Sequence, residues 1–329
     1  MSGTRRLVLF AGIDVDARLD YRPLVAAGVE PVRRFDLADV QDPGTLADAL
    51  NGAWGVVAGG EAMSRAVIDR VPTLKIIVRP GLGYDRVDIE AATDHGVVVV
   101  TTPGTIEPTV ADLTVGLMLA TSRRILEADM AVRDGRWRTK PTLSADLTGA
   151  TVSLIGLGRI GRLVAQRLSG FDVELVGAEL TPDRKFCEKY RIRIEEFDEA
   201  LRVGDFVSLH VPLNNMTERF IGAPQLAIMK RGSILVNTAR GELVDEVALA
   251  GALESGHLGG AGLDAFAVEP LPSTSPLLQL PNVVLSGHVG WATLRATMAM
   301  YSAALDGARL AALGQLPRHT LNPHAWSPS

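Results

Sequence analysis

Thr151-Val-Ser-Leu-Ile155, followed at once by Gly156-Leu-Gly-Arg-Ile-Gly161, is the stretch that decides the fold of this chain. Its first half is an apolar run typical of a buried strand, and its second half follows the pattern G-x-G-x-x-G. A helix is predicted over 159–169, and a second apolar run over 173–178 ends at Glu179. A strand, a tight glycine turn, a helix and a strand with an acid at its tip predict a dinucleotide-binding unit.

Each glycine of the pattern has a physical role in such a unit. Gly156 permits the tight turn, Gly158 lets the backbone approach a pyrophosphate at the helix N-terminus, and Gly161 lets helix and strand pack closely. Glu179 follows Gly161 by 18 residues, near the roughly 20 expected for the acid that binds ribose hydroxyls. A carboxylate there repels a 2′-phosphate, and the nearest following arginine is Arg184, so NAD is favoured over NADP. The alternative is a glycine-rich turn that binds nothing.

Length and composition limit the class of protein. The 329 residues predict about two domains, and 47% of them are hydrophobic. The net charge of −5 does not favour a nucleic-acid partner. The only cysteine, Cys187, allows no internal disulfide and is read as a packed thiol, and no metal site is predicted. The apolar run at 7–11 is too short for a signal peptide or a membrane span, which predicts a cytoplasmic protein without a membrane partner.

Strand and helix signals alternate twice along the chain. Strands are expected near 7–11, 31–35, 55–58, 74–78 and 97–100, with helices near 43–50, 61–71 and 88–95 between them. The same alternation resumes at Thr151 and continues through strands at 205–211, 233–238, 260–265 and 283–286. The sequence therefore predicts two Rossmann-like, doubly wound parallel-sheet domains of the α/β class, of which only the second carries the glycine pattern.

Two further helices connect or close these domains. The dense apolar segment 106–130, with Pro108 near its start, predicts one long buried helix. A terminal helix is expected over 292–312, followed by an irregular tail over 317–329. If the terminal helix returns to the first domain, that domain is discontinuous. We therefore expect a domain formed by 1–101 plus 295–329 and a dinucleotide-binding domain over 102–294.

Three side chains that suit proton and hydride chemistry follow predicted strands of the second domain. They are Arg240, Glu269 and His288, and ligands of open α/β sheets bind at the carboxyl ends of the strands. Histidine is a common proton donor, a nearby carboxylate such as Glu269 favours its charged form, and a guanidinium can grip a substrate carboxylate at two points. The alternatives are a helix-capping arginine, a solvated turn glutamate and a loop histidine.

The chain resembles the D-isomer-specific 2-hydroxyacid dehydrogenases over nearly its whole length. The motifs that carry the resemblance are LIGLGRIGR (154–162), LHVPL (209–213) with Thr217, MKRGSILVNTARGELVD (229–245), GLDAFAVEP (262–270) and PNVVLSGH (281–288). The resemblance implies an NAD-dependent oxidoreductase that interconverts a small 2-keto acid and its D-2-hydroxy acid. In such an enzyme Arg240 binds substrate, and Glu269 and His288 form the acid–base pair. Beyond the three glycines, the implied cofactor contacts are Arg159, Ile160, Glu179, His210, Val211, Pro212, Thr238, Ala239 and Asp264.

The resemblance also implies a substrate loop in the first domain. The segment Arg79-Pro-Gly-Leu-Gly-Tyr-Asp85 matches it, with backbone amides near Leu82 and Gly83 expected to meet the substrate carboxylate. Arg79 matches the position of an arginine in phosphoglycerate-type members, which leaves open a second anionic group such as phosphate or phosphonate. The alternatives are a simple glycine turn, and an Arg79 that pairs with Asp85 or Asp88.

Some positions depart from the family pattern. Ser286-Gly287 stands where Thr-Pro is common, which is expected to loosen the loop that aims His288; Ala265 and Glu107 are further departures. A different class of function, an NADH-sensing corepressor that dimerises and binds peptides, keeps the same three residues and is the alternative. By family analogy a homodimer is expected, with the long apolar helix after Ile106 as its face.

Overall fold

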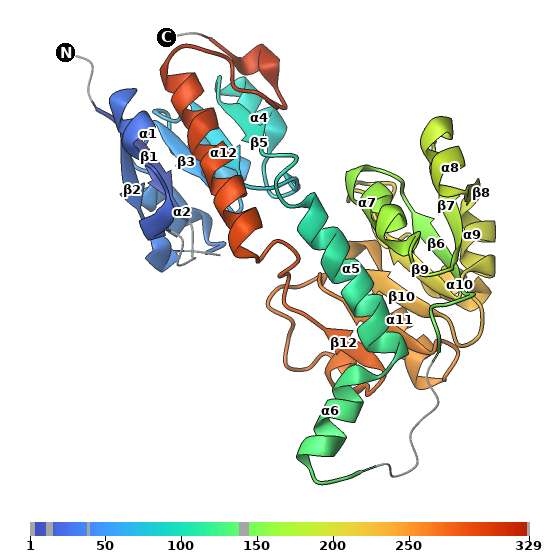
Figure 1. Cartoon of the computed structure of the whole chain (residues 1–329). Helices are drawn as coiled ribbons and strands as arrows, with labels where there is room; N and C mark the ends of the chain where they lie inside the picture. The colour runs from blue at the N-terminus through green and yellow to red at the C-terminus, as the bar shows by residue number, and fades with distance from the viewer. Residues whose placement is uncertain (1–3, 11–15, 38–39, 138–144, 328–329) are drawn as a thin grey trace. The chain divides into compact units, whose positions relative to one another are not determined.

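The structure is a computed structural model that describes residues 4–10, 16–37, 40–137 and 145–327. The chain forms two compact units, Met1–Ile106 with Ala292–Ser329, and Glu107–Trp291 (Figure 1). Each unit has its own parallel β-sheet and its own core of buried apolar side chains. The predicted class, two parallel-sheet α/β domains of which the first is discontinuous, is confirmed.

The first unit has a five-stranded parallel sheet in the order β2-β1-β3-β4-β5. Helices α1 and α12 pack together on one face of it, and α2, α3 and α4 form a second contiguous layer (Figure 1). The strands are β1 (Arg5–Leu9), β2 (Val29–Arg33), β3 (Gly55–Val57), β4 (Ile76–Arg79) and β5 (Val98–Thr101). The helices are α1 (Arg22–Ala26), α2 (Pro43–Ala49), α3 (Arg65–Ile68), α4 (Ile89–Asp94) and α12 (Leu294–Ala312), with 3-10 turns at Asp16–Arg18, Phe35–Leu37 and Pro323–Ala325.

The C-terminal segment is bound to the sheet of the first unit. Thr320 forms an antiparallel bridge with Val100 in β5. The Asn322 side chain accepts a hydrogen bond from the Val99 amide at 2.8 Å and donates one to the Val97 carbonyl at 2.9 Å. Both ends of the chain therefore build this unit, and the tail expected to be irregular contains a short 3-10 turn.

The second unit has a seven-stranded parallel sheet in the order β12-β11-β10-β9-β6-β7-β8. Strand order reverses between β6 and β9, which is where ligands bind in open α/β sheets. The strands are β6 (Thr151–Ile155), β7 (Glu174–Ala178), β8 (Ile192–Ile194), β9 (Phe206–Leu209), β10 (Ile234–Asn237), β11 (Gly260–Leu263) and β12 (Val283–Leu285).

Helices cover this sheet on both faces, as expected for a doubly wound unit. Helices α5 and α7 pack against each other, and α5 also contacts β10, β11 and β12, whereas α9, α10 and α11 form a second layer. The helices are α5 (Glu107–Ser122), α6 (Ile125–Arg133), α7 (Arg159–Leu168), α8 (Arg184–Tyr190), α9 (Phe197–Val203), α10 (Ala223–Ile228) and α11 (Glu246–Glu254), with 3-10 turns at Gly241–Leu243 and Pro276–Gln279.

The expectation of one long helix over 106–130 is wrong. The segment forms α5 and α6, separated at Arg124, whose φ of 50° is in the left-handed region. Helix α5 lies so close to β11 that a Cβ at Gly260 would stand 2.6 Å from Thr121 Cγ2. No residue of α6 is buried. Packing against the sheet therefore stabilises the helix only as far as Ser122, and the chain turns outward there (Figure 1).

The predicted helix over 61–71 is also shorter than expected. Only Arg65–Ile68 is helical, as α3. The residues before it join the next loop instead, because Met63 forms a parallel bridge with Val87. The backbone near Met63 therefore pairs with another loop and does not form the first turn of the predicted helix.

Candidate active site

The glycine turn after β6 is fixed by close backbone contacts. Gly156 has a φ of +98°, and a Cβ there would lie 2.9 Å from the His210 carbonyl carbon and oxygen. A Cβ at Gly161 would lie 2.1 Å from the Gly156 carbonyl oxygen. Gly158 is different, because a Cβ there would meet nothing within 4 Å. Two glycines are thus required by packing inside the unit, and the third leaves open space beside the start of α7.

That open space lies at a helix N-terminus. Gly158 is the N-cap of α7 and offers no capping side chain, and the first turn, which includes Arg159 and Ile160, holds no acid. The first amides of a helix have no intrahelical acceptor and carry a partial positive charge. This is the arrangement that receives a phosphate group.

Glu179 lies against the glycine turn. One of its carboxylate oxygens, Oε2, accepts a hydrogen bond from the Leu157 amide at 2.8 Å, and Oε1 accepts one from the Thr181 amide at 3.2 Å. Arg162 binds the carbonyl of Leu157, because its Nε donates to that oxygen at 2.9 Å. The Nη1 of Arg162 also contacts Asp183 Oδ2 at 2.9 Å. The glycine turn and the loop after β7 are therefore tied together.

His210 follows β9, under the glycine turn. Its amide donates to the Ile155 carbonyl at 2.7 Å, and its ring Nε2 lies 3.0 Å from Ser208 Oγ. Burial lowers the pKa of His210 to about 4, so its ring is neutral near pH 7. The next residue, Val211, reaches Gly156, since its Cγ1 lies 3.0 Å from the Cβ position there. The backbone at His210–Pro212 is thus brought beside the glycine turn.

The loop after β10 carries Thr238, Ala239 and Arg240. The Asn237 side chain braces it by accepting from the Ala239 amide at 3.0 Å and donating to the Arg240 carbonyl at 2.7 Å. The hydroxyl of buried Thr238 lies 2.8 Å from the Thr114 hydroxyl in α5. Asn237 was not singled out from the sequence; its position at a strand end next to the predicted residues is the signal that marks it.

Gly241 joins the loops after β10 and β11. A Cβ there would lie 1.9 Å from the Phe266 carbonyl carbon, so the two loops touch through their backbones. This contact places the Arg240 loop next to the segment that carries Glu269. Gly241 too was not predicted as a supporting residue, since only the fold brings it to Phe266.

His288 and Glu269 are hydrogen-bonded. The Nδ1 of His288 lies 2.9 Å from both Glu269 carboxylate oxygens, and Oε1 also accepts from the Phe266 amide at 3.1 Å. The side chain of His288 is 40% exposed and that of Glu269 is 23% exposed. A carboxylate on Nδ1 fixes the tautomer of the ring and directs Nε2 away from it, toward a partner outside the pair.

Asp264 lies at the end of β11 and is 2% exposed. Its carboxylate accepts hydrogen bonds from the Ser286 hydroxyl and from the amides of Val289 and Gly290. These three donors belong to the loop that carries His288. The residue that the sequence resemblance assigns to the cofactor is thus engaged with this loop.

In the first unit, Arg79 is 6% exposed and lies under the predicted substrate loop. Its guanidinium donates to the carbonyls of Ala58 at 3.0 Å, Glu61 at 3.3 Å and Gly83 at 3.3 Å. Within the described part of this unit, the amides of Leu82 and Gly83 make no hydrogen bond. The arginine supports the loop from inside, and the two amides remain open to an acceptor.

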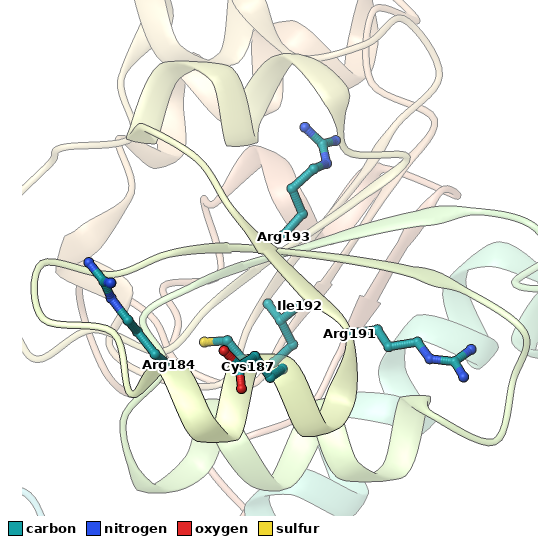
Figure 2. A pocket seen from close by; sticks show the side chains of 6 residues that line it. Arg184, Cys187, Arg191, Ile192 and Arg193 are labelled. Atoms are coloured by element: carbon teal, nitrogen blue, oxygen red, sulfur yellow. The ribbon is translucent and has the colours of Figure 1, made fainter.

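A surface hollow elsewhere in the second unit has none of the predicted catalytic, cofactor-binding or substrate-binding residues in its lining. It lies along α8 and β8, at the edge of the sheet. Figure 2 shows Arg184 and Arg191 pointing in opposite directions and Arg193 pointing away from both. The guanidinium groups do not converge on one point, so the hollow does not form a site for an anion.

The described residues contain neither a metal-binding cluster nor a helix that could span a membrane. No group of three or more His, Cys, Asp or Glu side chains is arranged to hold a metal ion there. In the same part of the chain, no helix has both the length and the apolar character needed to cross a membrane.

Comparison with known proteins identifies the family. Residues 115–290 match the model of the D-isomer specific 2-hydroxyacid dehydrogenase, NAD binding domain. The chain belongs to the D-isomer-specific 2-hydroxyacid dehydrogenase family. Its second unit is the NAD-binding domain of an NAD-dependent dehydrogenase, which confirms the resemblance seen in the sequence.

Named relatives support the same conclusion. The chain is 38% identical over 260 residues to a glyoxylate reductase of Korarchaeum cryptofilum, covering 78% of each protein. It is 38% identical over 268 residues to a D-3-phosphoglycerate dehydrogenase of Methanocaldococcus jannaschii, covering 81% of this chain but only 51% of that protein. The structure of a glyoxylate reductase from Paecilomyes thermophila matches with a TM-score of 0.86 at 29% identity, covering 97% of this chain and 98% of the other. These names do not favour the corepressor alternative.

Proposed function

We propose that this enzyme is an NADH-dependent reductase of a small 2-keto acid and forms the D-2-hydroxy acid. The observation that carries the proposal is the 2.9 Å contact between His288 and Glu269 at the strand ends of an NAD-binding sheet. The Arg240 loop follows the strand next to β11 in the same sheet. Relatives named glyoxylate reductase and glyoxylate/hydroxypyruvate reductase support a short keto acid as substrate.

The residues divide the reaction between them. When bound, NADH supplies a hydride for the keto carbon. In its protonated form His288, oriented by the contact of Nδ1 with Glu269, donates a proton from Nε2 to the keto oxygen and is left neutral. Arg240 binds the substrate carboxylate at two points and polarises the neighbouring carbonyl. In the reverse direction the same imidazole takes the hydroxyl proton.

The cofactor is held, in this proposal, by the residues around the glycine turn. Gly158, Arg159 and Ile160 present the α7 N-terminus to the pyrophosphate, and Glu179 accepts the ribose hydroxyls. The carboxylate of Glu179 also disfavours a 2′-phosphate, which supports NADH over NADPH. The remaining contacts are assigned to residues that follow β9, β10 and β11 of the same sheet: His210, Val211, Pro212, Thr238, Ala239 and Asp264.

The first unit is assigned to the substrate. The open amides of Leu82 and Gly83 suit a carboxylate, whereas Arg79 is buried against three backbone carbonyls. An arginine used in this way holds the loop in shape and has few donors left for a second anion. The geometry thus supports a keto acid with one anionic group, such as glyoxylate or hydroxypyruvate, over one that also carries phosphate or phosphonate.

The assembly proposed is a homodimer that uses α6. No residue of this helix is buried. It exposes large apolar side chains, and Trp137 follows it: Ile125, Leu126, Met130, Val132 and Trp137. Clustered apolar groups of this size on a surface mark an interface, and a second copy of the chain is the partner that the family analogy supports.

The test is a panel of 2-keto acids offered with NADH or NADPH and followed by the loss of reduced-cofactor absorbance. We expect glyoxylate or hydroxypyruvate to be reduced, NADH to be preferred, and phosphonopyruvate to be the poorer substrate. His288→Asn is expected to lower kcat by at least about a hundredfold and to leave NADH affinity within a factor of two. A wild-type protein that binds NADH but reduces none of the panel contradicts the proposal.

A further inference from the structure

We propose that Ser286 and Asp264 form a latch that holds the His288 loop in the backbone conformation needed for the contact with Glu269. The latch makes Ser286 a positioning residue for the reaction, because its hydroxyl acts through the loop and not on the substrate. The inference rests on the proposed role of His288 as proton donor.

The loop is attached to Asp264 at four points. Asp264 Oδ1 accepts from the Ser286 hydroxyl at 2.6 Å and from the Val289 amide at 2.9 Å, and Oδ2 accepts from the Gly290 amide at 2.9 Å. The Asp264 carbonyl accepts from the His288 amide at 2.7 Å. One buried residue therefore binds donors on both sides of the histidine.

The Ser286 hydroxyl has one proton, and its geometry shows where that proton goes. Its oxygen is 2.6 Å from Asp264 Oδ1 and 3.5 Å from the Leu263 carbonyl. The shorter contact, to a carboxylate in a buried position, is the stronger hydrogen bond. Of the four groups that donate hydrogen bonds to Asp264, the Ser286 hydroxyl is the one side chain; the other three are backbone amides.

The loop needs such a constraint because of its own backbone. His288 has a φ of 55°, in the left-handed region that a residue with a Cβ rarely adopts. Gly287, just before it, has no side chain to restrict its backbone, and a Cβ there would meet nothing within 4 Å. Left to itself, this segment has several accessible conformations, and few of them direct the imidazole toward Glu269.

Asp264 also explains why the His288 loop can contain Ser286-Gly287 where Thr-Pro is common in the family. Four hydrogen bonds to this one buried residue, three to its carboxylate and one to its backbone carbonyl, restrict the loop from outside, so stiffness within the loop is not required. A hydroxyl at position 286 is the part of this arrangement that a substitution can remove while leaving the backbone donors intact. Ser286→Ala therefore isolates the latch, and Ser286→Thr restores the hydroxyl.

The experiment compares Ser286→Ala, Ser286→Thr and a matched control, Ser255→Ala. Ser255 lies at the surface of the same unit, where its hydroxyl donates to the Ala252 carbonyl. Three quantities are measured on the full chain: kcat for the best keto acid with its pH profile, the NADH dissociation constant, and the NMR signal of the His288 Nδ1 proton, assigned by its loss in His288→Asn. Thermal unfolding confirms that each variant is folded.

We expect Ser286→Ala to lower kcat roughly tenfold, the effect of one hydrogen bond to a charged group, and to broaden or shift the Nδ1 proton signal. NADH affinity is expected to stay within twofold, and Ser286→Thr and Ser255→Ala are expected to match the wild type. A Ser286→Ala protein with wild-type kcat and an unchanged Nδ1 signal overturns the latch. If the wild type reduces no keto acid, the proposed function fails, and the NMR signal still decides the latch.

Discussion

Gly161→Ala and Gly158→Ala change two glycines of the same turn, and we expect the first to impair folding and the second to impair NADH binding. In Gly161→Ala the new Cβ would lie 2.1 Å from the Gly156 carbonyl oxygen, and this obstacle is backbone, which cannot move aside as the end of a flexible side chain can. The expected loss of stability is about 3 kcal/mol, at the upper end of the range for overpacking. In Gly158→Ala the Cβ meets no atom within 4 Å and φ is −70°, so the loss is only about 0.5 kcal/mol, from a poorer N-cap.

Gly158→Ala, which changes stability little, is expected to weaken cofactor binding. The Cβ of alanine at 158 would stand where a pyrophosphate must approach the first amides of α7. Losing one hydrogen bond to a charged group costs about 1.5–3 kcal/mol, which corresponds to a dissociation constant for NADH raised roughly ten- to hundredfold. Gly158→Ala is therefore expected to be a folded protein that binds NADH poorly.

The assay combines urea unfolding with titration of NADH fluorescence. Gly251→Ala serves as the matched control, because Gly251 lies inside α11 and a Cβ there also meets nothing within 4 Å. That variant should gain up to about 1 kcal/mol of stability from better helix propensity and bind NADH normally. Wild-type affinity in Gly158→Ala would refute the assignment of this turn to the pyrophosphate.

Three further predictions concern the site and its assembly. Burial lowers the pKa of His210 from 6.5 to about 4, so the unfolded chain binds a proton first as the pH falls. The free energy of unfolding should therefore drop by about 2 kcal/mol between pH 7 and pH 5 from this residue, a slope that His210→Asn should lack in urea titrations. Arg240→Lys should raise KM for the keto acid about tenfold through loss of two-point binding, and an unchanged kcat/KM argues against that role. Met130→Asp should convert the proposed dimer to a monomer in analytical ultracentrifugation, and a dimer that persists in this variant excludes α6 as the interface.

The dinucleotide unit was predictable because its signals are local. The turn at Gly156–Gly161 needs glycine for contacts made within a few residues or with the neighbouring strand, and Glu179 follows at the spacing that one helix and one strand require. Parallel strands place their carboxyl ends at one edge, so Arg240, Glu269 and His288 were expected near that edge from the strand pattern alone. Family membership rests on the same motifs.

Features that depend on burial were not readable in the sequence. The apolar run through 106–130 looks continuous, yet only its first part packs on β11, and the helix breaks at Arg124. The positive charge of Arg79 suggested an anion, but the fold encloses it among backbone carbonyls. In both cases the deciding contact comes from a segment distant in sequence.

Support for the site follows one pattern across the second unit. A residue at a strand end forms hydrogen bonds with the backbone of a loop that holds a candidate site residue. Asn237, the last residue of β10, binds the Arg240 carbonyl, and Asp264, just after β11, binds the His288 amide. Because strands are the most rigid parts of the unit, a loop tied to a strand end inherits that rigidity over its first few residues. The side chains proposed for proton donation and substrate binding, His288 and Arg240, each stand three residues beyond a strand end and are therefore positioned without a rigid loop sequence. This accounts for a loop that contains Gly287 and still presents His288 to Glu269.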